Sequence, residues 1–242
     1  MKLPPPRLEE VKPDYAPVHL RAGDDRSYTL NYPYGYATWS PWFEDWFQEI
    51  YRRVEPHTLV TADRCFVLHQ LARQNARRPG AFAECGVYRG GTALLLAEAT
   101  AGSGKPLHLF DTFAGMPAEA ADDPGVHSPG HFDDTSLDRV RNLLAPHECA
   151  RLHPGRLPAT LAEVAQESFS LVHLDVDLFA TTRDCLEFFH PRLVPGGALV
   201  IDDYGFELYR DTVRRAVDEF FADRPEVPLA LRSGQALLVR LP

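Results

Sequence analysis

Residues 81–100 read AFAECGVYRGGTALLLAEAT, and this stretch decides the fold. The apolar run Ala81–Val87 is followed by glycines and then by residues that favour a helix. Glycines between a strand and a helix let the backbone turn tightly and approach a bound molecule closely. Their positions, Gly86, Gly90 and Gly91, differ from the G-x-G-x-x-G fingerprint, which weakens a nicotinamide reading. The stretch predicts a strand, a turn and a helix of a ligand-binding α/β fold.

The same alternation of apolar runs and helical patterns continues along the chain. Further strands are predicted at Leu107–Phe110, Leu171–Leu174 and Ala198–Ile201. Helices are predicted at Thr61–Arg77, Ser136–Leu144, Thr181–Phe189 and Asp211–Phe221. The tail LALRSGQALLVRL predicts two strands around a turn at Ser233-Gly234. Short buried strands that alternate with helices predict an α/β protein with a Rossmann-like, mostly parallel, doubly wound sheet and an antiparallel C-terminal edge hairpin.

The N-terminal region differs in character from the rest of the chain. Residues 1–36 are rich in proline, tyrosine and charge without a clear period, so we expect an irregular arm. Ser40-Pro41 then resembles a helix start with serine at the N-cap and proline at the first helical position. Four aromatic residues on one helical face follow, namely Trp42, Phe43, Trp46 and Phe47. They form either a core or dimer contact or a substrate wall, and we divide the chain into 1–56 and a cofactor-binding domain, 57–242.

Composition restricts the class of protein and its partners. The 242 residues carry a formal net charge of -9, which argues weakly against nucleic acid or an anionic membrane as partner. No apolar run approaches the roughly 18 residues that a membrane span needs, and the N-terminus has no apolar signal core. The four cysteines, at positions 65, 85, 149 and 185, form no CxxC pair and suggest reduced thiols. We therefore expect a cytoplasmic protein whose partner is a small molecule.

Two acidic residues lie near the glycine-containing turn. Asp111 ends the strand after the turn, where an acid accepts hydrogen bonds from ribose hydroxyls in doubly wound folds. Glu84 lies just before the turn and could hold the amino group of a methionine moiety. A carboxylate at this position suits a cationic ligand better than a pyrophosphate, which it would repel.

Two further strands also end in acids. The run LVHL leads into Asp175-Val176-Asp177, and ALVI leads into Asp202-Asp203. The carboxyl ends of adjacent parallel strands meet at one edge of the sheet, so these carboxylates converge. Several acids in one crevice repel each other unless a cation neutralises them, and oxygen ligands suit Mg²⁺. Asp177 is the least certain member, because strand alternation would turn it away from Asp175.

A long loop rich in proline, glycine, aspartate and histidine covers residues 114–135. Its length indicates a functional lid over the ligand rather than a passive connection. The lid carries His127 and His131, whose side chains suit proton removal near neutral pH. The alternative proton acceptor is Asp175, acting from the metal.

Five blocks resemble the macrocin O-methyltransferase family: ECGVYRGG, LFDTFAGMP, HFDDTSLDRV, LDVDLFATT and VPGGALVIDDYG. The resemblance covers roughly residues 57–224 and implies a class I methyltransferase fold, S-adenosylmethionine and Mg²⁺. It implies metal ligation by Asp175, Asp202 and Asp203. Contacts to the cofactor are expected from Thr61, Glu84, Gly86, Tyr88, Gly90, Asp111, Thr112, Asp134, Ser136 and Asp175.

The function expected from these features is transfer of a methyl group to a hydroxyl of a small-molecule natural product, in particular a sugar unit of a glycosylated secondary metabolite. A metal explains why three aspartates lie beside a cofactor crevice, since it orients the hydroxyl and lowers its pKa. We expect a homodimer or higher homo-oligomer. A nicotinamide-dependent oxidoreductase and a catalytically inactive cofactor-binding protein are the alternatives. The first leaves the pair Asp202-Asp203 unexplained.

Overall fold

The computed structural model describes residues 18–21, 27–31, 36–118 and 127–242. The chain forms two compact units, Met1–Glu49 and Ile50–Pro242. The functional division at 56/57 that the sequence suggests remains a proposal. No helix in the described ranges combines the length and the apolar composition that crossing a membrane requires.

The first unit contains a small antiparallel sheet in the order β1-β2-β3. Its strands are β1 (Val18–Arg21), β2 (Ser27–Asn31) and β3 (Tyr36–Trp39). The prediction of an irregular arm over 1–36 is therefore wrong for these strands. Each is only four or five residues long, and cross-strand pairing rather than a period within each segment defines them.

The helix predicted after Ser40 also begins later than expected. Ser40 precedes a 3₁₀ turn, Pro41–Phe43, and its side chain makes no capping bond. The helix α1 then runs over Asp45–Val54 and is followed by a second 3₁₀ turn, Glu55–His57.

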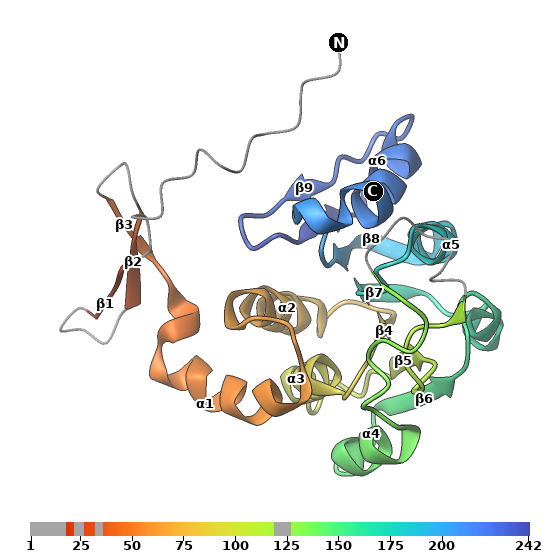
Figure 1. Ribbon diagram of the computed structural model, residues 1–242, viewed down its shortest axis with the longest axis horizontal. Helices are drawn as coiled ribbons and strands as arrows, with labels where there is room; N and C mark the ends of the chain where they lie inside the picture. The colour runs from red at the N-terminus through yellow and green to blue at the C-terminus, as the bar shows by residue number, and fades with distance from the viewer. Residues whose placement is uncertain (1–17, 22–26, 32–35, 119–126) are drawn as a thin grey trace. The chain divides into compact units, whose positions relative to one another are not determined.

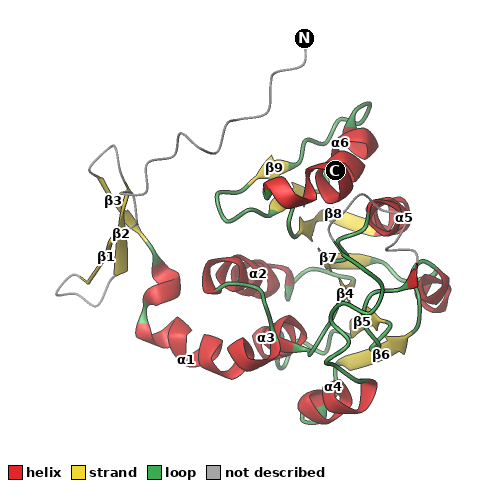
Figure 2. Cartoon of the chain, viewed as in Figure 1, coloured by secondary structure: helices red, strands yellow, loops and turns green. Residues whose placement is uncertain are grey.

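The second unit is built on a seven-stranded sheet in the order β6-β5-β4-β7-β8-β10-β9 (Figures 1 and 2). Its strands are β4 (Ala81–Cys85), β5 (Leu107–Asp111), β6 (Ala150–Pro154), β7 (Phe169–Leu174), β8 (Leu193–Ile201), β9 (Leu229–Ala230) and β10 (Ala236–Val239). Strands β4 to β8 pair in parallel, whereas β10 pairs antiparallel with β8 and β9. The predicted fold class, with its antiparallel C-terminal hairpin, is confirmed.

Helices pack on both faces of this sheet. They are α2 (Ala62–Asn75), α3 (Gly91–Ala99), α4 (Leu137–Leu144), α5 (Phe179–Phe189) and α6 (Arg215–Phe221), with a π-helical turn, Arg210–Arg214, before α6. Helices α2 and α3 lie on one side and α5 on the other (Figure 1). Short 3₁₀ segments cover Ala159–Val164, His190–Arg192 and Glu207–Tyr209. Every residue of β4 and β7 is buried, as expected for central strands covered on both faces, and this includes the polar residues Glu84, Ser170 and His173.

Candidate active site

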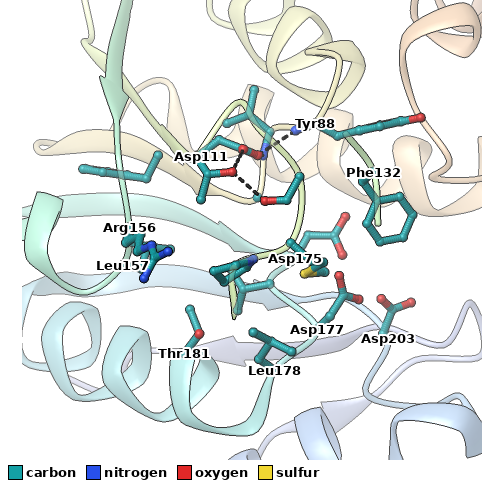
Figure 3. Close-up of a pocket in the computed structure, with 18 of the residues that line it drawn as sticks. Tyr88, Asp111, Phe132, Arg156, Leu157, Asp175, Asp177, Leu178, Thr181 and Asp203 are labelled. Carbon is teal, nitrogen blue, oxygen red and sulfur yellow. Dashed lines mark hydrogen bonds between the residues drawn. The ribbon is translucent and has the colours of Figure 1, made fainter. Parts of the chain in front are cut away.

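A cavity of about 500 Å³ opens at the carboxyl ends of the parallel strands (Figure 3). All residues that line it belong to the second unit. Most come from the carboxyl ends of β4, β5, β6, β7 and β8 and the segments that follow them, and from the start of α5. Others come from the stretch before α2 and from α2 itself, where Arg64 lines the cavity. This volume falls in the range of about 300–1,000 Å³ that is usual for small-molecule sites.

The turn after β4 requires glycine at position 86. Gly86 has a φ of +85°, and a Cβ there would lie 1.7 Å from the carbonyl oxygen of Asp175. The backbone after β4 and the backbone after β7 are therefore in direct contact, with no room for a side chain at position 86. Gly90 has a φ of +91° and immediately precedes α3, but it does not line the cavity.

Asp111 fastens this turn to the end of β5. One carboxylate oxygen accepts hydrogen bonds from the backbone amides of Val87 and Tyr88, at 2.7 and 2.8 Å. The other accepts from the amide of Phe113 at 2.7 Å. Figure 3 shows this carboxylate between the two loops at the cavity wall, so Asp111 shapes the predicted cofactor site as well as facing it.

Glu84 occupies a different place from the one expected of a cofactor ligand. It is fully buried, does not line the cavity, and lies 2.8 Å from Nδ1 of His173 on β7. The other ring nitrogen of His173 lies 3.3 Å from Asp202. Burial alone would lower the pKa of His173, but the hydrogen bonds with Asp202 and Glu84 raise it to about 10. The imidazolium ion therefore bridges Glu84 and Asp202, two buried acidic side chains behind the cavity.

Three aspartates converge at one end of the cavity. Asp175, Asp177 and Asp203 each present an oxygen within 4.8 Å of the other two, and Figure 3 shows the three side chains gathered there. Burial and the neighbouring acids raise the pKa of Asp175 well above its usual value. The same causes raise the pKa of Asp203 to about 8. Such a group of acids is suited to binding a cation.

Asp177 joins this group against the expectation from strand alternation. Its φ of +61° is in the left-handed region, so the segment after β7 is not extended at this residue. The side chain instead lines the cavity, and its carboxylate lies 3.6 Å from Nε2 of His127.

Asp202 lies behind the cavity wall and belongs to a second group with His173 and Asp175. Its Oδ1 accepts from Arg64 at 2.7 Å and from the amide of Asp203 at 3.0 Å. Its Oδ2 lies near His173 and Gln235. Burial would raise the pKa of Asp202, but the hydrogen bond from His173 and the charge of Arg64 lower it.

The loop over residues 114–135 is described at both ends, while residues 119–126 lie outside the described ranges. His127 lies 3.0 Å from the hydroxyl of Tyr209 and 3.4 Å from His131. Neither histidine lines the cavity, whereas Phe132 and Tyr209 do.

The remaining predicted cofactor residues divide into two sets. Tyr88 and Thr112 line the cavity. Asp134 and Ser136 do not: Asp134 accepts from the Tyr88 hydroxyl at 2.7 Å, and Ser136 caps α4 by accepting from the amide of Arg139. Thr61 likewise lies outside the lining and accepts a hydrogen bond from Arg64.

The sequence does not predict all of the residues that line the cavity. The segment Gly155–Pro158 after β6 also lines the cavity, as do Thr181 and Asp184 of α5. In Figure 3, Arg156 and Leu157 lie on the side of the cavity away from the aspartates. The signal for β6 is weak because it is an edge strand with a mixed burial pattern. Had β6 been identified, the rule that ligands bind at the carboxyl ends of strands would have included this segment.

The raised pKa of Asp203 predicts how stability depends on pH. Because the folded-state pKa is about 8 and the unfolded value is ordinary, this group stabilises the fold fully at low pH and the contribution is lost as pH rises through 8. In a chelator, we expect the melting temperature to fall between about pH 5 and pH 8. Mg²⁺ should reduce the fall, since it binds the charged form. Thermal unfolding with and without Mg²⁺ checks this, and an equal fall in Asp203→Asn would contradict it.

The sheet order, the glycine turn and the cavity at the strand ends together define a class I methyltransferase fold. Among solved structures, the O-methyltransferase NovP superposes with a TM-score of 0.67 at 24% identity, covering 77% of this chain and 83% of that one. CalS11, a calicheamicin methyltransferase, superposes with a TM-score of 0.62 at 20% identity, covering 81% and 93%. These similarities show the fold.

The family model for macrocin O-methyltransferase (TylF) matches residues 46–229, and the chain therefore belongs to this family. A tetracenomycin rhamnoside 4'-O-methyltransferase of Streptomyces olivaceus is 32% identical over 148 residues, which are 56% of this chain and 57% of that protein. Mycinamicin III 3''-O-methyltransferase of Micromonospora griseorubida is 27% identical over 179 residues, which are 67% of this chain and 70% of that protein. The match thus spans little more than half the length of the first relative.

Proposed function

We propose that the chain is an S-adenosylmethionine- and Mg²⁺-dependent O-methyltransferase that acts on a hydroxyl of a small-molecule natural product, in particular on a sugar unit. The observation that carries the proposal is the cavity itself, which joins a glycine turn of the methyltransferase fold to a cluster of aspartates. Membership of the macrocin O-methyltransferase family supports the same reaction and speaks against a nicotinamide enzyme.

The donor would bind along the wall formed by Gly86, Tyr88, Asp111 and Thr112, with Gly155–Pro158 at the far end. S-adenosylmethionine supplies an electrophilic methyl group. The cavity fits such a molecule. Its volume suits a nucleoside with an amino acid side arm, and glycine at position 86 lets the backbone approach the ligand closely. Glu84 would act on this site only indirectly, since it is buried with His173.

The cation would bind to Asp175, Asp202 and Asp203, the set that the sequence predicts. The support for this set is that Asp175 belongs to two groups of potential ligands, one with His173 and Asp202 and the other with Asp177 and Asp203. Oxygen donors favour a hard ion such as Mg²⁺, which lowers the pKa of a bound hydroxyl. The carboxylates would hold the ion at this end of the cavity, and the ion would supply the charge that orients the acceptor hydroxyl.

We assign removal of the proton to Asp177, which revises the choice between the lid histidines and Asp175. Asp177 lines the cavity next to Asp175 and Asp203, whereas His127 and His131 do not. His127 contacts Asp177 from behind, so it would orient the carboxylate rather than meet the acceptor. A base must reach the proton that it removes, and geometry therefore favours Asp177.

The names of the relatives support the class of acceptor. The enzymes from S. olivaceus and M. griseorubida are named for methylating a rhamnosyl tetracenomycin and a mycinamicin. A hydroxylated sugar on a natural product is the corresponding acceptor for this chain. Cytoplasmic location and a homo-oligomeric state are further proposals from the sequence.

Calorimetric titration with S-adenosylhomocysteine tests the donor site. We expect Asp111→Ala to weaken binding on the order of 10²-fold, because each lost hydrogen bond to a charged group is worth roughly 1.5–3 kcal/mol and the turn at Val87-Tyr88 loses its anchor. Asp138→Ala removes a carboxylate that pairs with Arg141 on the surface, and it should bind like the wild type. Equal affinity in Asp111→Ala would show that the donor does not bind at this wall.

A further inference from the structure

The guanidinium group of Arg64 contacts Asp202 and Asp203, the two aspartates that follow β8. Nη1 of Arg64, on α2, is 2.7 Å from Asp202 and 3.3 Å from Asp203. The Arg64 side chain is only 10% exposed, so solvent screens these contacts little. A single guanidinium nitrogen thus bridges the two carboxylates that end β8.

The other donors of Arg64 bind the segment just before α2. Nη2 donates to the carbonyl of Leu59 at 3.1 Å, and Nε donates to the hydroxyl of Thr61 at 3.2 Å. The ring of Phe206 lies 5.3 Å from the guanidinium carbon. With contacts on three sides, the guanidinium is held in one orientation beside the acids.

A divalent ion and Arg64 would compete for the same oxygens. Asp202 and Asp203 together offer four carboxylate oxygens, and Arg64 already donates to one oxygen of each residue. Two positive charges bound to the same pair of carboxylates repel each other strongly when the site is buried, because water screens them little. His173 does not replace Arg64 in this role, because it contacts Asp202 from the opposite side, next to Glu84.

We propose that Arg64 is a positioning residue that acts as a resident counter-cation: it holds Asp202 and Asp203 in place before metal binding and weakens the binding of the divalent ion, which keeps that ion exchangeable. The inference rests on the proposed metal dependence. This role explains why the positively charged Arg64 lies in a site that is also proposed to bind a metal ion. The acids remain paired in the absence of metal, which limits the cost of burying them.

Titration with Mn²⁺, followed by the electron paramagnetic resonance of the free ion, tests this role without turnover. We expect Arg64→Gln to bind Mn²⁺ at least about tenfold more tightly than the wild type, because a repelling charge is removed. Arg53→Gln is the matched control: it removes the same charge from an exposed residue that pairs with Glu98, and its affinity should stay within about twofold. Binding of S-adenosylhomocysteine reports whether each variant is folded.

The outcomes separate this inference from the proposed function. Wild-type protein that binds no Mn²⁺ would overturn the metal dependence and the role of Arg64 with it. Wild-type protein that binds Mn²⁺, together with Arg64→Gln that binds it equally or more weakly, would overturn the role of Arg64 alone. If Arg64→Gln does not fold, Arg64→Lys decides. Its shorter ammonium group cannot bridge both acids, so binding about threefold tighter or more supports the role, and equal or weaker binding overturns it.

Discussion

Asp175→Asn is expected to lower kcat on the order of 10³-fold at saturating Mg²⁺. A bound metal ion contributes several kcal/mol of transition-state stabilisation, and each loss of roughly 1.4 kcal/mol lowers the rate tenfold. Asp175 is the residue common to both groups of potential ligands. A neutral amide keeps the shape of the side chain but is a weaker ligand for a hard cation. The Mg²⁺ concentration for half-maximal rate should therefore rise as well.

Steady-state kinetics at several Mg²⁺ concentrations measures both effects. The matched control is Asp138→Asn, the same chemical change in an exposed residue of α4, for which no loss is expected. The backbone amide of Asp175 bonds to the carbonyl of Cys85, and this bond is independent of the side chain. If Asp175→Asn kept the wild-type rate and the wild-type Mg²⁺ dependence, these aspartates would not form the metal site.

Asp177→Asn should lower kcat on the order of 10²–10³-fold at neutral pH, which is the usual contribution of a general base. Part of the rate should return at high pH, where hydroxide takes over proton removal. His127→Gln should have a smaller effect, on the order of tenfold, because His127 supports Asp177 without lining the cavity. His131→Gln should leave the rate near the wild-type value, since it contacts His127 rather than the aspartates.

The rate against pH at saturating Mg²⁺ distinguishes these roles. A loss in His127→Gln that exceeds the loss in Asp177→Asn would restore the lid histidine as the base. Unchanged rates in both variants would leave Asp175 as the group that removes the proton. Melting temperatures of the variants control for loss of fold.

The sequence sufficed for the features that depend on continuous local patterns. The run Ala81–Val87, the glycines after it and the acids that end β7 and β8 each carry their signal within a few residues. Because parallel strands align their carboxyl ends, their order along the chain already placed the acids together. The edge strand β6 and the three N-terminal strands lack such patterns, since their pairing partners rather than their own periodicity define them.

Within the site, the positions that differ from those expected have a common physical cause. Strand alternation predicts that Asp177 points away from Asp175, but alternation fails where φ is +61°. Glu84 was expected at the cofactor, but the register of β4 against β7 sets it beside His173. Arg64 lies 138 residues from Asp202 in the chain, so no local spacing predicts their contact. Pairing between distant segments determines each of these positions.

The most direct test is methyl transfer from S-adenosylmethionine to natural-product glycosides, with the sugar products and S-adenosylhomocysteine measured by mass spectrometry. With Mg²⁺, we expect an O-methylated sugar and an equal amount of S-adenosylhomocysteine. Excess chelator should lower the rate at least about 10²-fold, and added Mg²⁺ should restore it. Methyl transfer at an undiminished rate in excess chelator would contradict a metal-dependent mechanism at Asp175, Asp202 and Asp203.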